Sequence, residues 1–269
     1  MDEVKPSISF FFPVYNDERT IVQLTQRARQ VLLDVAQDFE IVIINDGSRD
    51  RSGQVADELA AKYPEVIVVH HQGNQGYGRA IQTGFARANR YEWVCFTDGD
   101  FQYDPGELYH IAKLLPHYDV VAGFRFRKVY GPLRVLMSAG LNWGVRLLYG
   151  TRYRDITCGL KLVRRSVLDE LQIKSTSGFV GAELVLRAAL AGYRIGEVGI
   201  STYDREFGDS AAVSWQNIKT TFRDLMQLRK EVFQNRPRAN DVGSLAADHC
   251  SSGTVTAENA SESSRSAQL

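Results

Sequence analysis

The stretch WVCFTDGDFQYD, residues 93–104, gives the clearest indication of the fold of this 269-residue chain. An apolar run before Asp98 predicts a buried strand, and two carboxylates separated by one glycine follow directly at its end. Asp98 and Asp100 would repel one another there unless a divalent cation lay between them. Mg²⁺ and Mn²⁺ prefer such oxygen ligands, and Gln102 adds a neutral oxygen two residues later. A solvated Asp-Gly turn is the alternative interpretation of the same residues.

Short apolar runs alternate with helical patterns on both sides of this stretch. The predicted strands are rich in β-branched residues and mostly apolar on both faces, and they cover residues 8–12, 39–44, 66–69, 93–97 and 120–122. Helical spacing of apolar residues predicts helices at 20–35, with Thr20 as the cap, and at 52–63, 80–89 and 107–115. This order predicts an α/β fold, with a mostly parallel central sheet and helices on both faces.

Polar residues follow the predicted strands, at the sheet edge where ligands of parallel α/β sheets bind. The first strand is followed by PVYNDE at 13–18, the second by NDGSRD at 45–50, and the third, after a short gap, by NQGYGR at 74–79. Asp46 is placed either to accept hydrogen bonds from a nucleobase or ribose, or to close an Asx turn. Because carboxylates stand at three strand ends, a cation site is the better interpretation of the aspartate pair.

Two further patterns are similar to known binding sites, but each lacks a required feature. Gly76-Tyr77-Gly78 is similar to the start of a dinucleotide-binding loop, but Ile81 stands where the third glycine is required, which argues against a Rossmann dehydrogenase. His70 and His71 have no partners at metal-ligand spacing, so we expect them to be structural.

Composition and charge narrow the class of protein. The 32 Lys and Arg residues balance 32 Asp and Glu residues, so no nucleic-acid partner is expected. Three cysteines without metal-binding spacing predict a reducing compartment.

The sequence also predicts the location of the protein and the extent of its folded domain. No signal-peptide pattern and no apolar run of transmembrane length is present, so we expect a cytoplasmic protein that is not secreted. From Gln234 onward there is no aromatic residue, which predicts a folded domain at 1–233 and a disordered tail at 234–269.

The segments FFFPVYNDE, IVIINDGSRDRS, NQGYGRAIQTG and TDGDFQYDP, in this order, resemble family-2 glycosyltransferases with the GT-A fold. Within that family they are most similar to dolichyl-phosphate mannose synthases and related polyprenyl-phosphate glycosyltransferases. The likeness continues through YRDITCGLKLVRRS, GFVGAELVLRA and YDREFGDS, and covers about residues 7–215. It implies a metal-dependent inverting enzyme that moves a hexose from a nucleoside-diphosphate sugar to a polyprenyl or dolichyl phosphate.

The resemblance also implies roles for individual residues. The nucleotide-binding positions of the family are matched by Pro13, Tyr15, Glu18 and Asp46. The site of the Mg²⁺ or Mn²⁺ ion and the diphosphate is matched by Asp98, Asp100 and Gln102. The arginine facing the reacting phosphates is matched by Arg125, the acceptor-phosphate positions by Arg134 and Ser138, and a late loop arginine by Arg205.

Other functions stay open on the sequence. A lipid-phosphate acceptor is already an anion and needs no strong base, whereas a sugar hydroxyl acceptor would need a carboxylate base such as Glu183 or Asp155. For Glu183 we prefer the alternative that it pairs with Arg187 at i+4. A non-catalytic nucleotide-sugar binding protein is a further alternative. A sugar nucleotidyltransferase would need a Gly-rich loop with an arginine where this chain has PVYNDE.

Two apolar segments with interspersed basic residues, 129–149 and 213–233, are candidates for helices at a membrane surface. Core packing or a dimer face would explain the same pattern. A peripheral position on the cytoplasmic face of the membrane is therefore one expected location.

Overall fold

The computed structural model describes residues 5–126, 132–151, 153–203 and 215–234. The chain divides into a compact unit, Met1–Arg229, and a second unit, Lys230–Leu269, of which only residues 230–234 are described. The predicted domain boundary at residue 233 and the predicted tail therefore stay predictions.

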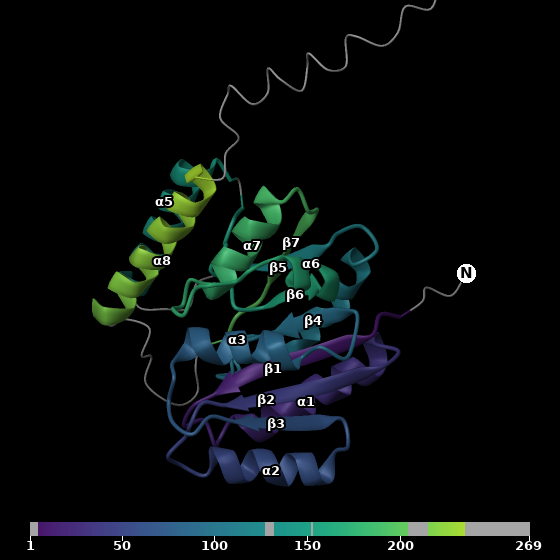
Figure 1. Ribbon diagram of the computed structural model, residues 1–269. Coiled ribbons are helices and arrows are strands. Elements are labelled where there is room, and N and C mark those ends of the chain that lie inside the picture. The colour runs from purple at the N-terminus through teal and green to yellow at the C-terminus, as the bar shows by residue number, and fades with distance from the viewer. Residues whose placement is uncertain (1–4, 127–131, 152, 204–214, 235–269) are drawn as a thin grey trace, which may run out of the picture. The chain divides into compact units, whose positions relative to one another are not determined.

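One seven-stranded sheet forms the centre of the first unit (Figure 1). In chain order its strands are β1 (Ile8–Val14), β2 (Phe39–Asn45), β3 (Val66–His70), β4 (Trp93–Phe96), β5 (Val120–Arg125), β6 (Lys161–Arg164) and β7 (Ile195–Ile200). Their order in space is β3-β2-β1-β4-β6-β5-β7. Only β6 runs antiparallel to its neighbours among these strands, so the sheet is mostly parallel, as predicted.

Helices connect the strands. They are α1 (Ile21–Val35), α2 (Ser52–Lys62), α3 (Tyr77–Arg87), α4 (Leu108–Ile111), α5 (Pro132–Tyr149), α6 (Arg165–Glu170), α7 (Val180–Leu190) and α8 (Trp215–Gln234). Two 3₁₀ turns, Pro105–Glu107 and Ala112–Leu114, flank α4.

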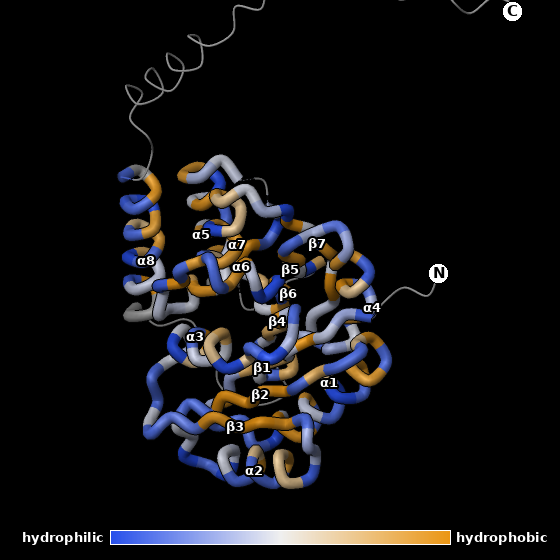
Figure 2. The backbone as a smooth tube through the Cα atoms, turned by 45° about the vertical axis from the view of Figure 1, so that its right-hand side comes forward, coloured by the Kyte–Doolittle hydropathy of each residue, from blue (hydrophilic) through white to orange (hydrophobic). Residues whose placement is uncertain are grey.

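The sheet has a hydrophobic core on each face, because alternate residues of a strand point to opposite sides. Phe10 and Phe12 of β1 pack with α1, α2 and α4 on one face, whereas Phe11 packs with α3, α6 and α7 on the other. Figure 2 shows the hydrophobic colour running along β2 and β3. Both faces of the sheet are therefore covered by helices, as the apolar strands predicted.

The structure corrects three local predictions. Helix α3 begins at Tyr77, three residues earlier than predicted, directly after Gly76 with its positive φ of 90°. The predicted helix at 107–115 is α4 between two 3₁₀ turns. Thr20 is the N-terminal cap of α1 by position, but its hydroxyl donates to the carbonyl oxygens of Asp17 and Gly99 and makes no capping bond.

Helices α5 and α8 lie side by side in both views (Figures 1 and 2), and the Tyr149 hydroxyl of α5 donates to the Leu225 carbonyl of α8 at 3.0 Å. Along the described residues, neither these nor any other helix is long and apolar enough to cross a membrane.

Candidate active site

Asp98 and Asp100 lie in the turn that follows β4, at the edge where the parallel strands β1 and β2 also end. The turn is pressed against the end of β1: a Cβ atom at Gly99 would come within 2.1 Å of the Pro13 carbonyl oxygen. Only glycine fits there, which explains its place between the two carboxylates. Asp100 is buried, and its Oδ1 accepts a hydrogen bond of 3.1 Å from the Gln102 backbone nitrogen.

These residues fit a divalent cation. The Gln102 side-chain oxygen Oε1 is buried and has no hydrogen-bond partner among the described residues. A buried amide oxygen without a partner is costly, and a cation ligand is one way to satisfy it. The described residues hold no group of three or more His, Cys, Asp or Glu side chains that could bind a metal ion. Two carboxylates and an amide oxygen suit Mg²⁺ or Mn²⁺, which keep phosphate oxygens in their shell.

Tyr77 is a neighbour of the aspartate pair that the sequence analysis did not identify. Its hydroxyl donates to Asp98 Oδ1 at 2.7 Å. Burial of the hydroxyl, and then the charge of Asp98, raise the pKa of Tyr77 well above its usual value, although 39% of the residue is exposed. Tyr77 is therefore a neutral donor that orients one oxygen of Asp98.

The loops after β1 and β2 hold each other through reciprocal hydrogen bonds. The Asn16 backbone nitrogen donates to Ser48 Oγ at 3.1 Å, and Asn16 Oδ1 accepts from the Arg49 backbone nitrogen at 2.8 Å. Glu18 Oε2 accepts from the Arg51 backbone nitrogen at 3.0 Å, at the start of α2. Glu18 thus fixes this loop pair, and its predicted nucleotide contact stays a prediction, like those of half-buried Pro13 and exposed Tyr15.

Asp46 binds the loop that follows β3. Its Oδ1 faces His71 Nδ1 at 2.6 Å and accepts from the Gln75 backbone nitrogen at 2.9 Å, while Oδ2 accepts from the Gly76 backbone nitrogen at 2.9 Å. His71 Nε2 also contacts Thr83 Oγ1 at 3.0 Å, so both ring nitrogens of His71 have partners within the fold. Asp46 is buried among these donors, and its contact with a nucleotide stays a prediction.

A second polar cluster surrounds Arg125, at the end of β5. Its guanidinium donates through Nε and Nη2 to both carboxylate oxygens of Asp155, at 2.6 and 2.8 Å, and Nη2 also donates to Thr157 Oγ1 at 2.8 Å. The hydroxyl of Ser138, on α5, lies 3.1 Å from that of Thr157. The structure therefore brings together two of the predicted site residues, Arg125 and Ser138, through a threonine that the prediction omitted.

Asn142 ties α5 to this cluster. Its side-chain nitrogen donates to the Ser138 carbonyl at 2.8 Å, and its Oδ1 accepts from the Ile156 backbone nitrogen at 3.0 Å. Arg134 belongs to α5, one helical turn before Ser138, but the structure does not describe its side chain, and Arg205 lies outside the described residues.

Both candidate bases are engaged elsewhere. The two oxygens of Asp155 accept from Arg125. Glu183 is buried, accepts from the backbone nitrogens of Lys174 and Ser175, and pairs with Arg187 at 2.6 Å. The predicted i+4 pair of Glu183 and Arg187 is thus confirmed.

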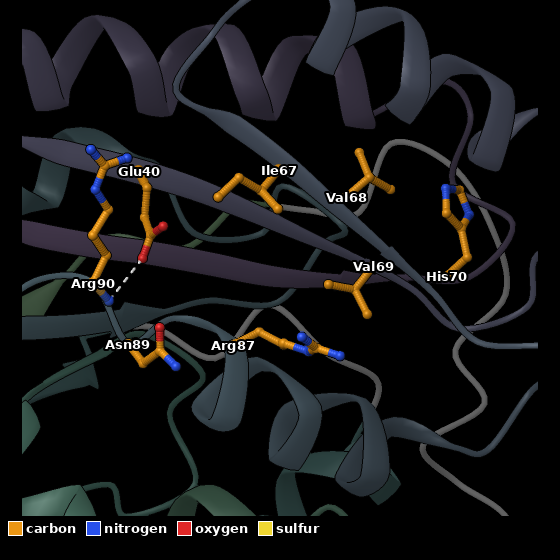
Figure 3. Close-up of a pocket in the computed structure, with 8 residues that line it drawn as sticks. All are labelled: Glu40, Ile67, Val68, Val69, His70, Arg87, Asn89 and Arg90. Atoms are coloured by element: carbon orange, nitrogen blue, oxygen red, sulfur yellow. Dashed lines mark hydrogen bonds between the residues drawn. The ribbon is translucent and has the colours of Figure 1, made fainter.

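A pocket of about 620 Å³ lies beside β3 and contains none of the predicted site residues (Figure 3). Its walls come from β3 and from residues 87–90, with Glu40 at the start of β2. The Glu40 carboxylate accepts from Ser9 Oγ at 2.5 Å and from the Arg90 backbone nitrogen at 3.3 Å, so this buried charge has partners within the fold.

The site residues that the prediction missed are Tyr77, Asn142 and Thr157. One signal was available for Asn142, a polar residue one turn after Ser138 on an otherwise apolar helix. For Tyr77 and Thr157 the sequence holds no comparable signal, because their partners Asp98 and Arg125 are distant in the chain.

A mostly parallel sheet with helices on both faces and an aspartate pair beyond β4 defines the class of GT-A glycosyltransferases. The chain belongs to glycosyl transferase family 2, whose model matches residues 9–172. This confirms the predicted family, fold and enzyme class.

Individual relatives agree with this assignment. An undecaprenyl-phosphate 4-deoxy-4-formamido-L-arabinose transferase of Pseudomonas fluorescens (strain Pf0-1) is 31% identical over 207 residues, which are 76% of this chain and 59% of that protein. The protein of the same name from Photorhabdus laumondii is 29% identical over 76% of this chain and 62% of its own length. The chain therefore spans about three fifths of these relatives.

Solved structures are similar in fold. A glucosyl-3-phosphoglycerate synthase from Mycobacterium tuberculosis, in complex with Mn²⁺, uridine diphosphate and phosphoglyceric acid, superimposes with a TM-score of 0.68. The two are 17% identical, and the match covers 87% of this chain and 80% of that one.

Proposed function

We propose that this chain is a metal-dependent inverting glycosyltransferase that transfers a hexose from a nucleoside-diphosphate sugar to a polyprenyl or dolichyl phosphate. The observation that carries the proposal is the position of segment 155–161. At its start, Asp155 and Thr157 bind Arg125, and at its centre Gly159 contacts Asp98. One short segment thus contacts both a carboxylate site and an arginine site, which supports a reaction between two phosphorylated substrates.

On the donor side, Asp98, Asp100 and the Gln102 amide oxygen would hold Mg²⁺ or Mn²⁺. When bound, the cation would act as a Lewis acid on the leaving diphosphate. The two carboxylates give the site a negative charge before binding, and Tyr77 keeps one oxygen of Asp98 in place. The Mn²⁺ and uridine diphosphate bound to the mycobacterial protein support testing these ligands first.

On the acceptor side, Ser138, Arg134 and Arg205 would bind the phosphate, and Arg125, whose Nε and Nη2 already donate to Asp155 and Thr157, would face the reacting phosphates as a fixed positive charge. A guanidinium stays charged and binds phosphate oxygens through two parallel hydrogen bonds, which offsets the repulsion between the two substrates. A phosphate monoester is already a nucleophile, so no base is needed. The engagement of Asp155 and Glu183 supports this acceptor over a hydroxyl. Attack opposite the leaving diphosphate would invert the anomeric centre.

Exposed apolar side chains on α5 support contact with a lipid surface. Leu136, Trp143 and Leu147 are 69%, 67% and 68% exposed, and their spacing places them along one side of the helix. On α8, Phe222 and Met226 are also exposed, with the exposed basic residues Lys219 and Arg223 close by in sequence. This combination is typical of helices that lie in a membrane interface.

The test is a transfer assay with a short-chain polyprenyl phosphate and a panel of nucleoside-diphosphate sugars. The panel should contain hexoses and a 4-deoxy-4-formamido-L-arabinose donor, because the curated relatives are named for that sugar. We expect transfer with Mn²⁺ or Mg²⁺, no transfer with excess chelator, and an inverted anomeric centre by NMR. Transfer to sugar hydroxyls alone would overturn the acceptor, and donor binding without any transfer or hydrolysis would indicate a non-catalytic binding protein.

A further inference from the structure

Lys161 is a buried lysine at the start of β6, with only 1% of its surface exposed. It pairs with Phe96 of β4 on one side and with Ala122 of β5 on the other. Its Nζ donates to the Cys158 carbonyl oxygen and lies 5.6 Å from the centroid of the Phe96 ring. Burial lowers the pKa of Lys161, and the nearby Cys158, Asp155 and Asp98 oppose that shift. Lysine is rarely enclosed to this degree, because removing its charge from water is costly.

The carbonyl that Lys161 binds belongs to a turn that contacts Asp98. A Cβ atom added at Gly159 would lie 2.5 Å from Asp98 Oδ2 and 2.8 Å from its Cγ. The backbone of Gly159 is therefore packed directly against this carboxylate. The Tyr77 hydroxyl donates to Oδ1 at 2.7 Å. The position of each Asp98 oxygen is therefore restricted by a different neighbour, Oδ1 by Tyr77 and Oδ2 by Gly159.

The same turn is continuous with the anchor of Arg125. Asp155 and Thr157 bind the guanidinium, and the Cys158 backbone nitrogen donates to the Asp155 carbonyl at 3.3 Å. A shift of the Cys158–Gly159 peptide would therefore move Asp98 relative to Arg125. The bond from the Lys161 side chain links this peptide to β6.

We propose that Lys161 is a positioning residue for Asp98, which acts by holding the Cys158–Gly159 turn against that carboxylate. The inference rests on the proposed function, because it takes Asp98 as a metal ligand. Lys161 lies behind the turn and is not a catalytic residue. Residues that orient metal ligands typically contribute 10- to 100-fold to metal affinity, which sets the size of the effect expected here.

The experiment compares Mn²⁺ binding, alone and with uridine diphosphate, by electron paramagnetic resonance in three full-length proteins. Lys161→Met removes the donor and keeps an unbranched side chain of similar length. Val163→Ala is the matched control, because Val163 is buried two residues further along β6 and packs in the core away from the turn. We expect Mn²⁺ affinity to fall about tenfold or more in Lys161→Met and to stay unchanged in Val163→Ala, even where both melt at lower temperature.

Unchanged Mn²⁺ affinity in a folded Lys161→Met protein would overturn the inference and leave the proposed function intact. If Lys161→Met does not fold, Gly159→Ala tests the contact on which the inference depends, because its new methyl group would press on Asp98 and Tyr103 while Lys161 stays. Gly159→Ala is then expected to weaken Mn²⁺ binding, and unchanged binding would overturn the inference. Absence of Mn²⁺ binding by the unaltered chain would overturn the proposed metal site, and this inference with it.

Discussion

Arg125 and Asp155 form a bidentate ion pair in which the two side chains are only 4% and 3% exposed. The guanidinium is therefore fixed in orientation before any substrate binds. Removing one partner of such a pair is destabilising, because the other partner is then a buried charge without a counterion.

Replacing Asp155 by Asn is expected to lower the free energy of unfolding by about 3–5 kcal/mol, because Arg125 would keep its charge in a buried place. Urea denaturation measures the effect. Arg194→Ala is the matched control, since Arg194 pairs with Asp119 at 3.3 Å but is 63% exposed, and its loss should cost less than about 1 kcal/mol. Equal stability of Asp155→Asn and the unaltered chain would contradict a stabilising role of the pair.

Asp100→Ala, and to a lesser degree Asp98→Ala, should abolish sugar transfer while the fold is kept. The carboxylates lie in a turn beyond β4, so their removal leaves the two cores intact, whereas the loss of a cation ligand costs orders of magnitude in rate. Transfer rates and circular dichroism together test this, with Glu58→Ala, at an exposed position of α2, as the control. Full activity of Asp100→Ala in saturating chelator would rule out the metal assignment.

Neutralising Arg134 or Arg205 should weaken use of the lipid-phosphate acceptor more than binding of the donor. A charge-assisted contact to phosphate contributes about 1.5–3 kcal/mol, which corresponds to roughly 10- to 100-fold in acceptor KM. Arg146→Ala is the matched control, because Arg146 is on the same helix but its guanidinium donates to the Tyr153 carbonyl. If Arg134→Ala and Arg205→Ala both leave acceptor kinetics unchanged, the predicted second phosphate site is wrong.

The double replacement Leu136→Ser with Leu147→Ser should reduce binding to anionic lipid vesicles at least severalfold, because it removes apolar area from the exposed side of α5. Co-sedimentation with vesicles measures the bound fraction. Leu33→Ser provides the control, because Leu33 is 53% exposed but belongs to α1 and not to α5. Equal losses in both proteins would mean that α5 does not form the lipid contact.

Cys95 and Cys158 should resist alkylation in the folded protein at about pH 8, since the thiolate is the reactive form. Burial raises the pKa of Cys158 from 9.0 to about 11, and burial raises that of Cys95 well above its usual value. The pKa of Cys158 is higher in the folded than in the unfolded state, so the folded state holds the thiol proton more tightly. The resulting contribution to the free energy of unfolding is complete below about pH 9 and is lost as the pH rises through about 11. Mass spectrometry after alkylation of a Cys250→Ser protein tests this, and rapid native labelling of Cys158 would contradict it.

Much of the fold follows from local sequence. The apolar, β-branched runs and the helical spacing between them predicted β1 to β5 and the α/β class, because the backbone period and burial of each segment are encoded within a few residues. Asp98 and Asp100 were identified for a related reason, since a short motif at the end of a strand has a fixed place in a parallel sheet. The sequence alone also predicted the pair of Glu183 and Arg187, which are one helical turn apart.

Only the tertiary structure decided which side chains hold these residues in place. Tyr77 and Asp98 are 21 residues apart in the chain. Arg125 and Asp155 are 30 residues apart, as are Asp46 and the Gly76 amide that donates to it. Lys161 had no sequence signal at all, because β6 is the short antiparallel strand between β4 and β5 and its burial depends on both neighbours. Local periodicity sets which face a residue occupies, whereas the partners of a buried charge are set by the packing of distant segments against one another.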